Sequence, residues 1–127
     1  MLKFRFLLWA LTKLLQRAVK KNAACARYIH EKRLVFQIQT ADGTGRHFSI
    51  ADGKVRSSAG LTPNPSFTMT FRNAQRGFAV LSAKEGTDAF LSSLRDQDLV
   101  IRGDFVEVMW FQGLTAYLQA DKALDPH

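Results

Sequence analysis

The sequence has few of the residues that cross-link or interrupt a chain. Its 127 residues include one cysteine, and no proline or glycine occurs before Gly43. A single cysteine excludes an intramolecular disulfide, and Cys25 has no metal-type spacing to a histidine. No apolar run approaches the roughly 20 residues that a membrane-spanning helix needs. Hydrophobic residues make up 46% of the chain, so we expect one folded unit with a core of its own rather than a disordered protein.

Acidic residues are nearly absent from the first quarter of the chain. Residues 1–33 hold nine basic side chains and one acidic one, a formal charge of +8, whereas residues 34–127 carry −1. A folded nucleic-acid-binding surface usually spreads its basic residues over the whole domain, so nucleic acid is not the expected partner. Basic residues also interrupt the apolar stretch that a cleaved signal peptide requires. We therefore expect the segment to be retained and the protein to be cytoplasmic, peripheral at the inner membrane.

Apolar residues in this basic segment recur at the i, i+3, i+4, i+7 spacing of an amphipathic helix. The opposite face carries the residues that we assign to membrane binding: Phe6, Trp9, Lys13, Arg17, Lys20 and Lys21. Basic side chains can meet anionic headgroups while aromatic rings lie at the membrane boundary. Two other interpretations remain open. The helix can simply dock on the domain with its charges in water, or it can act as a basic arm that binds nucleic acid.

From residue 34 the apolar period changes to two, which predicts strands near 34–39, 47–50, 54–58, 66–71 and 98–102. Asp52-Gly53 is a strong hairpin signal. One face of these strands is rich in Leu, Phe, Ile and Met, and the other in Gln, His, Ser and Thr. This pattern predicts a two-layer α+β fold whose mainly antiparallel sheet is covered by helices on one face.

Three further helices are expected to provide that cover. Asn73 can cap a helix to about residue 83, Gly86 breaks the chain, and Thr87 or Asp88 can begin the next helix. Asp104 can cap a last helix to about residue 120. That last helix is apolar on nearly all sides, so it must be covered on both. One side can pack on the sheet, and the other must meet the N-terminal helix, a partner, a membrane or a ligand.

No set of residues indicates catalysis. The three histidines lie far apart in the sequence, and the motifs of hydrolases, zinc proteases and phosphate-binding loops are absent. We expect a protein that is not an enzyme, with no catalytic residues, no metal and no cofactor.

Four motifs occur in the order found in the sterol carrier protein type 2 family, which the chain resembles from about Leu34 to Leu118. They are LVFQI at 34–38, ADGKV at 51–55, NPSFTMTF at 64–71 and IRGD at 101–104. The resemblance implies a five-stranded sheet, an apolar tunnel under the helices and non-enzymatic binding of a lipid such as an isoprenoid quinone intermediate, a fatty acyl chain or a sterol. It suggests these tunnel-lining positions: Phe78, Leu81, Phe90, Leu91, Leu94, Met109, Trp110, Leu114 and Leu118.

The resemblance also suggests a cellular role. Bacterial members with a single such domain include accessory factors of ubiquinone biosynthesis, so biosynthetic enzymes or a second copy of the chain are further expected partners. We divide the chain into a basic helix at 1–33, a lipid-binding domain at 34–120 and a tail at 121–127. The leading hypothesis is a carrier that presents a lipid at a membrane surface. The alternative is a scaffold that recruits biosynthetic enzymes through exposed apolar helices without a ligand of its own.

Overall fold

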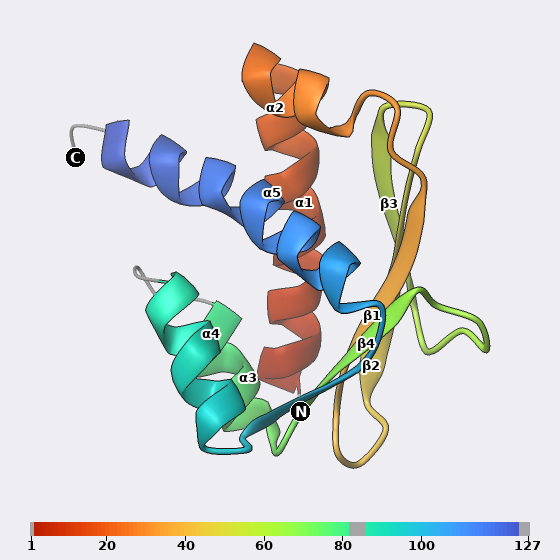
Figure 1. Ribbon diagram of the computed structural model, residues 1–127, viewed down its shortest axis with the longest axis vertical. Coiled ribbons are helices and arrows are strands. Elements are labelled where there is room, and N and C mark those ends of the chain that lie inside the picture. Colours follow the sequence, from red (N-terminus) through yellow and green to blue (C-terminus); the bar gives the residue numbers. More distant parts are fainter. Residues whose placement is uncertain (1, 82–85, 125–127) are drawn as a thin grey trace.

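The computed structural model describes residues 2–81 and 86–124; within these ranges the side chains at 2, 78, 86, 87 and 119–124 are outside the description. Helices and strands follow in the order α1 (Leu2–Lys21), α2 (Ala23–Ile29), β1 (Leu34–Thr40), β2 (Gly45–Ala51), β3 (Lys54–Ala59), β4 (Phe67–Phe71), α3 (Ala74–Leu81), α4 (Gly86–Arg95), β5 (Leu99–Gly103) and α5 (Phe105–Leu124). The helices form a layer on one face of the sheet (Figure 1). The predicted α+β architecture is confirmed.

The five strands form one sheet in the order β3-β2-β1-β4-β5. Three of its four pairings are antiparallel, but β1 and β4 run parallel, with Phe36 opposite Phe67. The sheet is therefore mixed, although mainly antiparallel as expected. The parallel pair arises because the chain leaves β3 at one edge and passes back across the sheet to the far side of β1. The Asp52-Gly53 hairpin is confirmed, with positive φ at both residues, as its turn type requires.

The strand alternation places the apolar residues of the sheet beneath the helices. Phe36, Phe48 and Phe67 are fully buried, and the ring of Phe36 stacks on both of the others at 5.0 Å between centroids. Phe111 of α5 packs on Phe36 at 4.7 Å. The opposite, polar face is partly covered, because Gln37 there accepts a hydrogen bond from the backbone of Thr62 and is buried.

The N-terminal segment forms two helices rather than one. Asn22 is extended (φ −116°, ψ 110°), and its side-chain oxygen accepts the N–H groups of Ala24 and Cys25. Asparagine is a strong N-cap, so α2 begins anew at Ala23. The asparagine that ends α1 and begins α2 was visible in the sequence, although neither proline nor glycine marks the break.

The other helix boundaries are close to prediction. Asn73 accepts the N–H of Arg76 and caps α3, and Asp104 accepts those of Val106 and Glu107 and caps α5. Gly86, predicted as a breaker, is instead the first residue of α4. The last helix continues to Leu124 rather than to about residue 120, because no breaker precedes Pro126.

Candidate functional site

The apolar stripe of α1 lies in the core of the molecule. Phe4, Leu8, Leu11 and Leu15 are buried there against the sheet and the neighbouring helices. Glycine at position 77 makes room for Phe4, since a Cβ on Gly77 would lie 2.5 Å from its ring. The docked position predicted as one possibility is therefore the one observed. The division of the chain at residue 33 into a basic helix and a lipid-binding domain stays a prediction.

The outer face of α1, defined as Phe6, Trp9, Lys13, Arg17 and Lys20, is exposed along its whole length. Phe6 is 66% exposed and Trp9 45%. Their rings are in contact at 5.7 Å, and the ammonium of Lys13 lies 5.7 Å from the Trp9 ring. Lys21 is also exposed at the end of the helix. All six residues assigned to membrane binding thus lie in water while the helix remains docked.

Eight of the nine predicted tunnel-lining residues have described side chains, and these occupy three environments. Phe90 and Leu114 are buried in the core, and Leu91 and Met109 are about half exposed. A third group is partly buried and packs on the core: Leu81, Leu94, Trp110 and Leu118. The side chain of Phe78 is outside the described residues. These positions come from the layer above the sheet, as expected; that they enclose a tunnel stays a prediction.

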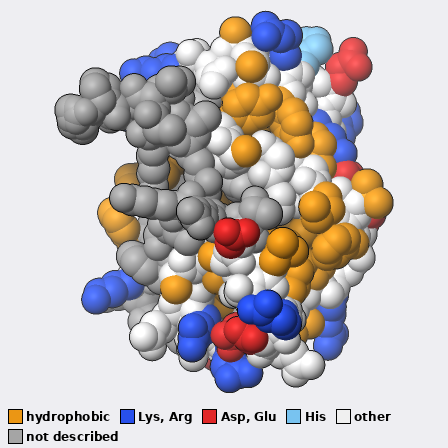
Figure 2. All heavy atoms as spheres, turned by 60° about the vertical axis from the view of Figure 1, so that its left-hand side comes forward, with side chains coloured by type: hydrophobic (Ala, Val, Ile, Leu, Met, Phe, Trp, Pro, Cys, Tyr) orange, Lys and Arg blue, Asp and Glu red, His pale blue; other side chains and the backbone are white. Residues whose placement is uncertain are grey.

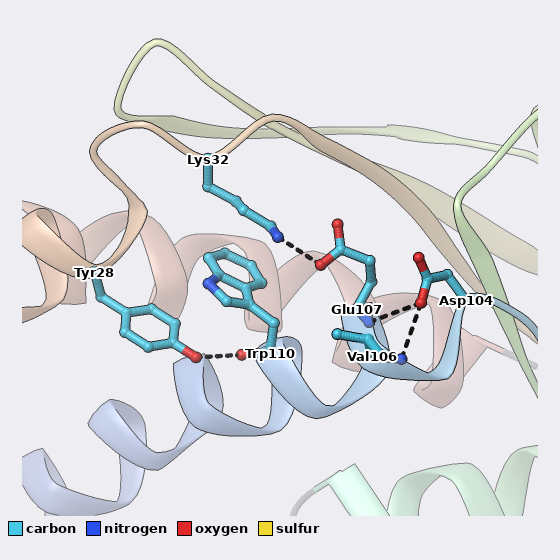
Figure 3. A network of polar contacts seen from close by, with 6 residues as sticks. All are labelled: Tyr28, Lys32, Asp104, Val106, Glu107 and Trp110. Carbon is cyan, nitrogen blue, oxygen red and sulfur yellow. Dashed lines mark hydrogen bonds and ion pairs between the residues drawn. The ribbon is translucent and has the colours of Figure 1, made fainter.

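A cluster that sequence reasoning missed joins α2 to α5 (Figure 3). The ring of Tyr28 stacks on Trp110 at 5.0 Å, and its hydroxyl donates a hydrogen bond of 2.7 Å to the Trp110 carbonyl. The ammonium of Lys32 lies 4.9 Å from the centroid of the Trp110 ring and forms an ion pair with Glu107. We call these four residues, Tyr28, Lys32, Glu107 and Trp110, the α2–α5 clamp.

The clamp fits closely around the backbone of α5. A Cβ on Gly113 would lie 2.3 Å from the Tyr28 hydroxyl oxygen, so glycine is required for the tyrosine to approach. Burial raises the pKa of the Tyr28 phenol, and the neighbouring Tyr117 adds to the rise. The partners are about 80 residues apart in sequence, and no periodicity connects them. The one available signal was an isolated glycine within an apolar helix.

A pocket of about 550 Å³ adjoins the clamp at the end of α2. Its lining residues are Arg27, Tyr28, His30, Glu31 and Lys32. All five side chains carry charged or ionisable groups, so this pocket does not suit an apolar chain, which needs a mainly hydrophobic wall.

The first turns of α5 expose a group of apolar side chains that we call the α5 patch: Phe105, Val106 and Met109. Their exposed fractions are 49%, 75% and 50%. Exposed apolar side chains gather over part of the face that carries α4 and α5 (Figure 2). Leu91 of α4 is likewise 53% exposed. A single exposed leucine needs no explanation, but a contiguous group indicates an interaction surface.

Within residues 2–81 and 86–124, no three His, Cys, Asp or Glu side chains gather into a possible metal site. None of the helices in these ranges is long and apolar enough to cross a membrane.

Comparison with known proteins gives matches only in structure. No family model matches the sequence, and no curated protein matches it. The structure titled "UbiJ-SCP2 Ubiquinone synthesis protein" superposes with a TM-score of 0.63 at 16% identity, covering 92% of this chain and 96% of that one. The sterol carrier protein domain 2 of Helicoverpa armigera gives 0.61 at 15% identity, covering 90% and 89%. Sterol carrier protein 2 from Yarrowia lipolytica gives 0.54 at 11% identity, covering 86% and 89%.

These matches cover between 86% and 92% of this chain and between 89% and 96% of the other chains. At such low sequence identity they establish the fold and leave the ligand to be argued. The chain has the fold of the sterol carrier protein 2 domains.

Proposed function

We propose that this protein binds an apolar lipid without chemical conversion and presents it at a membrane surface, as an accessory factor in ubiquinone biosynthesis. The observation that carries the proposal is the match to the UbiJ-SCP2 structure over 92% of this chain and 96% of that one. Because that structure is of a ubiquinone synthesis protein, we propose an isoprenoid quinone intermediate as the ligand class; fatty acyl chains and sterols are the other candidates.

The proposed lipid site lies between the helices and the sheet. Phe90 and Leu114 would form its floor, and the partly buried residues that pack on the core would form its walls: Leu81, Leu94, Trp110 and Leu118. Leu91 and Met109 would stand at its rim, and Phe78 completes the predicted set. Each CH₂ group that leaves water is worth about 0.8 kcal/mol, so a long isoprenoid chain needs no catalytic or charged anchor to bind.

The outer face of α1 would bring the loaded protein to an anionic membrane. Phe6 and Trp9 lie at one end of this face and Lys13, Arg17 and Lys20 follow, so aromatic and basic side chains can reach the same plane. Each basic residue near an anionic leaflet contributes about 1 kcal/mol. Because the apolar stripe of α1 stays in the core, this attachment does not require the helix to leave the domain.

Lipid binding is tested by native mass spectrometry of gently purified protein and by uptake of a fluorescent isoprenoid probe. We expect a co-purifying lipid and saturable uptake. Leu94→Gln should weaken uptake, because it places a polar amide in the proposed wall. Val100→Gln is the control, since Val100 is an exposed strand residue outside that wall. A ligand-free protein that takes up neither isoprenoid nor acyl probes would refute lipid binding.

Membrane association is tested separately by flotation with anionic liposomes. Changing Lys13, Arg17, Lys20 and Lys21 together to Gln should abolish flotation. The matched control removes the same charge elsewhere on the surface, at Lys54, Arg56, Arg95 and Arg102. If both quadruple variants float equally well, the outer face of α1 is not the attachment site.

The α5 patch favours a second function, a scaffold that recruits biosynthetic enzymes without its own ligand. Val106 is 75% exposed on the first turn of α5, beside the half-exposed Phe105 and Met109. Val106→Gln and Met109→Gln should then abolish co-purification with ubiquinone-biosynthesis enzymes while the fold is kept. Saturable lipid uptake by the isolated protein would instead favour the carrier function.

A further inference from the structure

A second pocket, of about 400 Å³, lies between the N-terminal half of α1 and the ends of β1, β2 and β3. Arg5 enters it from α1 and Arg46 from β2. Three of its nine lining residues are glycines: Gly43, Gly45 and Gly60. Gly43 and Gly60 have positive φ, and nothing lies within 4 Å of where their Cβ atoms would be. The backbone of both turns is therefore open to a small ligand.

The two arginines supply positive charge that no carboxylate of the described residues neutralises by an ion pair. Arg46 is held in place, because its Nε donates a 2.6 Å hydrogen bond to the Ser57 hydroxyl, which in turn lies 2.8 Å from the hydroxyl of Thr12 on α1. This bond uses one N–H and leaves the two terminal nitrogens of the guanidinium for another acceptor. A guanidinium held by one edge is well suited to bind a phosphate.

Asp42 also lines the pocket and determines which anions fit. Its Oδ1 accepts hydrogen bonds from the hydroxyl of Thr40 and, at 3.0 Å, from the N–H of Thr44. The carboxylate is thus held by its own turn and forms no ion pair with either arginine. It still lowers the formal charge of the lining residues to +1. Two guanidiniums beside one carboxylate suit a phosphodiester with a hydroxyl-bearing arm better than a free phosphate ion, because the carboxylate can accept from the hydroxyl.

The pocket opens beside the proposed membrane surface. Arg5 directly precedes Phe6, which is 66% exposed on the outer face of α1, and Trp9 follows one turn later. We propose that this pocket binds the phosphodiester headgroup of a membrane phospholipid such as phosphatidylglycerol, with Arg5 and Arg46 on the phosphate and Asp42 on a headgroup hydroxyl. The inference rests on the proposed membrane association and adds headgroup selectivity to it.

The test has a soluble arm and a membrane arm. In the first, glycerophosphoglycerol and inorganic phosphate are titrated separately while the amide resonances of Gly43 and Gly60 are followed by NMR. We expect the glycerophosphodiester to shift both resonances and to bind more tightly than phosphate. The double variant Arg5→Gln, Arg46→Gln should weaken it by at least about tenfold, the loss expected for charge-assisted hydrogen bonds. Arg56→Gln with Arg102→Gln, two exposed arginines outside the pocket and the outer face of α1, is the charge-matched control.

In the membrane arm, flotation is compared between phosphatidylglycerol and phosphatidylserine vesicles of equal charge. We expect the wild type to prefer phosphatidylglycerol and the Arg5, Arg46 variant to lose only that preference. Arg46→Lys, which keeps the charge, guards against misfolding and should retain part of the selectivity. Equal binding of phosphate and glycerophosphodiester, or flotation that is measurable but equal on both lipids, would overturn the proposal. Loss of flotation on both lipids, with tighter binding of the glycerophosphodiester retained in the soluble arm, would refute membrane association alone, so the two proposals fail separately.

Discussion

The two long helices have the same length but opposite relations to solvent. Both α1 and α5 contain 20 residues. In α1 the buried stripe and the charged outer face are sharply divided, and its exposed aromatic residues lie among basic ones. In α5 the apolar residues surround the helix, so Phe111 is buried while Phe105 is about half exposed six residues earlier. The outer face of α1 is suited to a charged surface, and that of α5 to an apolar one.

This contrast suggests that the exposed faces of the two helices contact different partners. An exposed apolar group costs solubility and adds little to folding, so the α5 patch is best explained by what it contacts in use. The outer face of α1 is compatible with water until an anionic surface is near. Substitutions on the buried face of each helix should therefore lower the free energy of unfolding. Substitutions on the exposed face should leave it nearly unchanged and should alter binding instead.

The largest expected effect is on the buried face of α5. Phe111→Ala removes a fully buried ring that packs on Phe36 and Phe67, and it should lower the free energy of unfolding by about 3–5 kcal/mol. Phe105→Ala, on the same helix but about half exposed, is the matched control and should change it by less than about 1 kcal/mol. Urea denaturation measures both. Equal losses would mean that the α5 patch is part of the folding core.

An intermediate effect is expected where α5 meets α2. In the wild type, Gly113→Ala forces Tyr28 away from its hydrogen bond to Trp110, because the new Cβ would lie 2.3 Å from the hydroxyl oxygen. The loss should be about 1 kcal/mol net of the gain in helix propensity. In a Tyr28→Ala background the same substitution should stabilise α5 by up to about 1 kcal/mol. This double-mutant cycle isolates the contact; additive effects would show that the clamp does not restrain α5.

Much of the fold could be predicted from local sequence signals. The alternation in residues 34–39 and 66–71, the Asp52-Gly53 turn and the Asn73 and Asp104 caps all depend on neighbouring residues, and all are confirmed. The outward position of Phe6 and Trp9 followed from the helical period as well.

What could not be predicted depends on contacts between distant segments. The parallel pairing of β1 with β4 is determined by the path of the chain after β3, and the pattern of either strand allows both directions. The α2–α5 clamp brings Lys32 to Glu107 across 75 residues. The pocket beside Arg5 arises where α1 meets the turns at the ends of the strands, and no sequence pattern connects these distant segments. Candidate lipid positions came from the family resemblance, and the mixture of buried and exposed residues among them could not be read from period alone.

The smallest expected effect is a pH dependence of the clamp. Burial, and to a lesser extent Tyr117, raises the pKa of Tyr28 in the folded state above the ordinary value of about 10. The neutral phenol is thus favoured by folding, so its contribution to stability is complete below the unfolded pKa and is lost as pH rises through the folded pKa. The unfolding free energy should therefore fall more steeply above pH ~10 in the wild type than in Tyr28→Phe. Tyr117→Phe should keep most of the slope, because burial is the larger cause.

Urea denaturation over the alkaline range measures the three slopes. If the Tyr28→Phe slope equals that of the wild type, ionisation of this phenol does not loosen the contact between α2 and α5, and the alkaline loss of stability has its origin elsewhere in the fold.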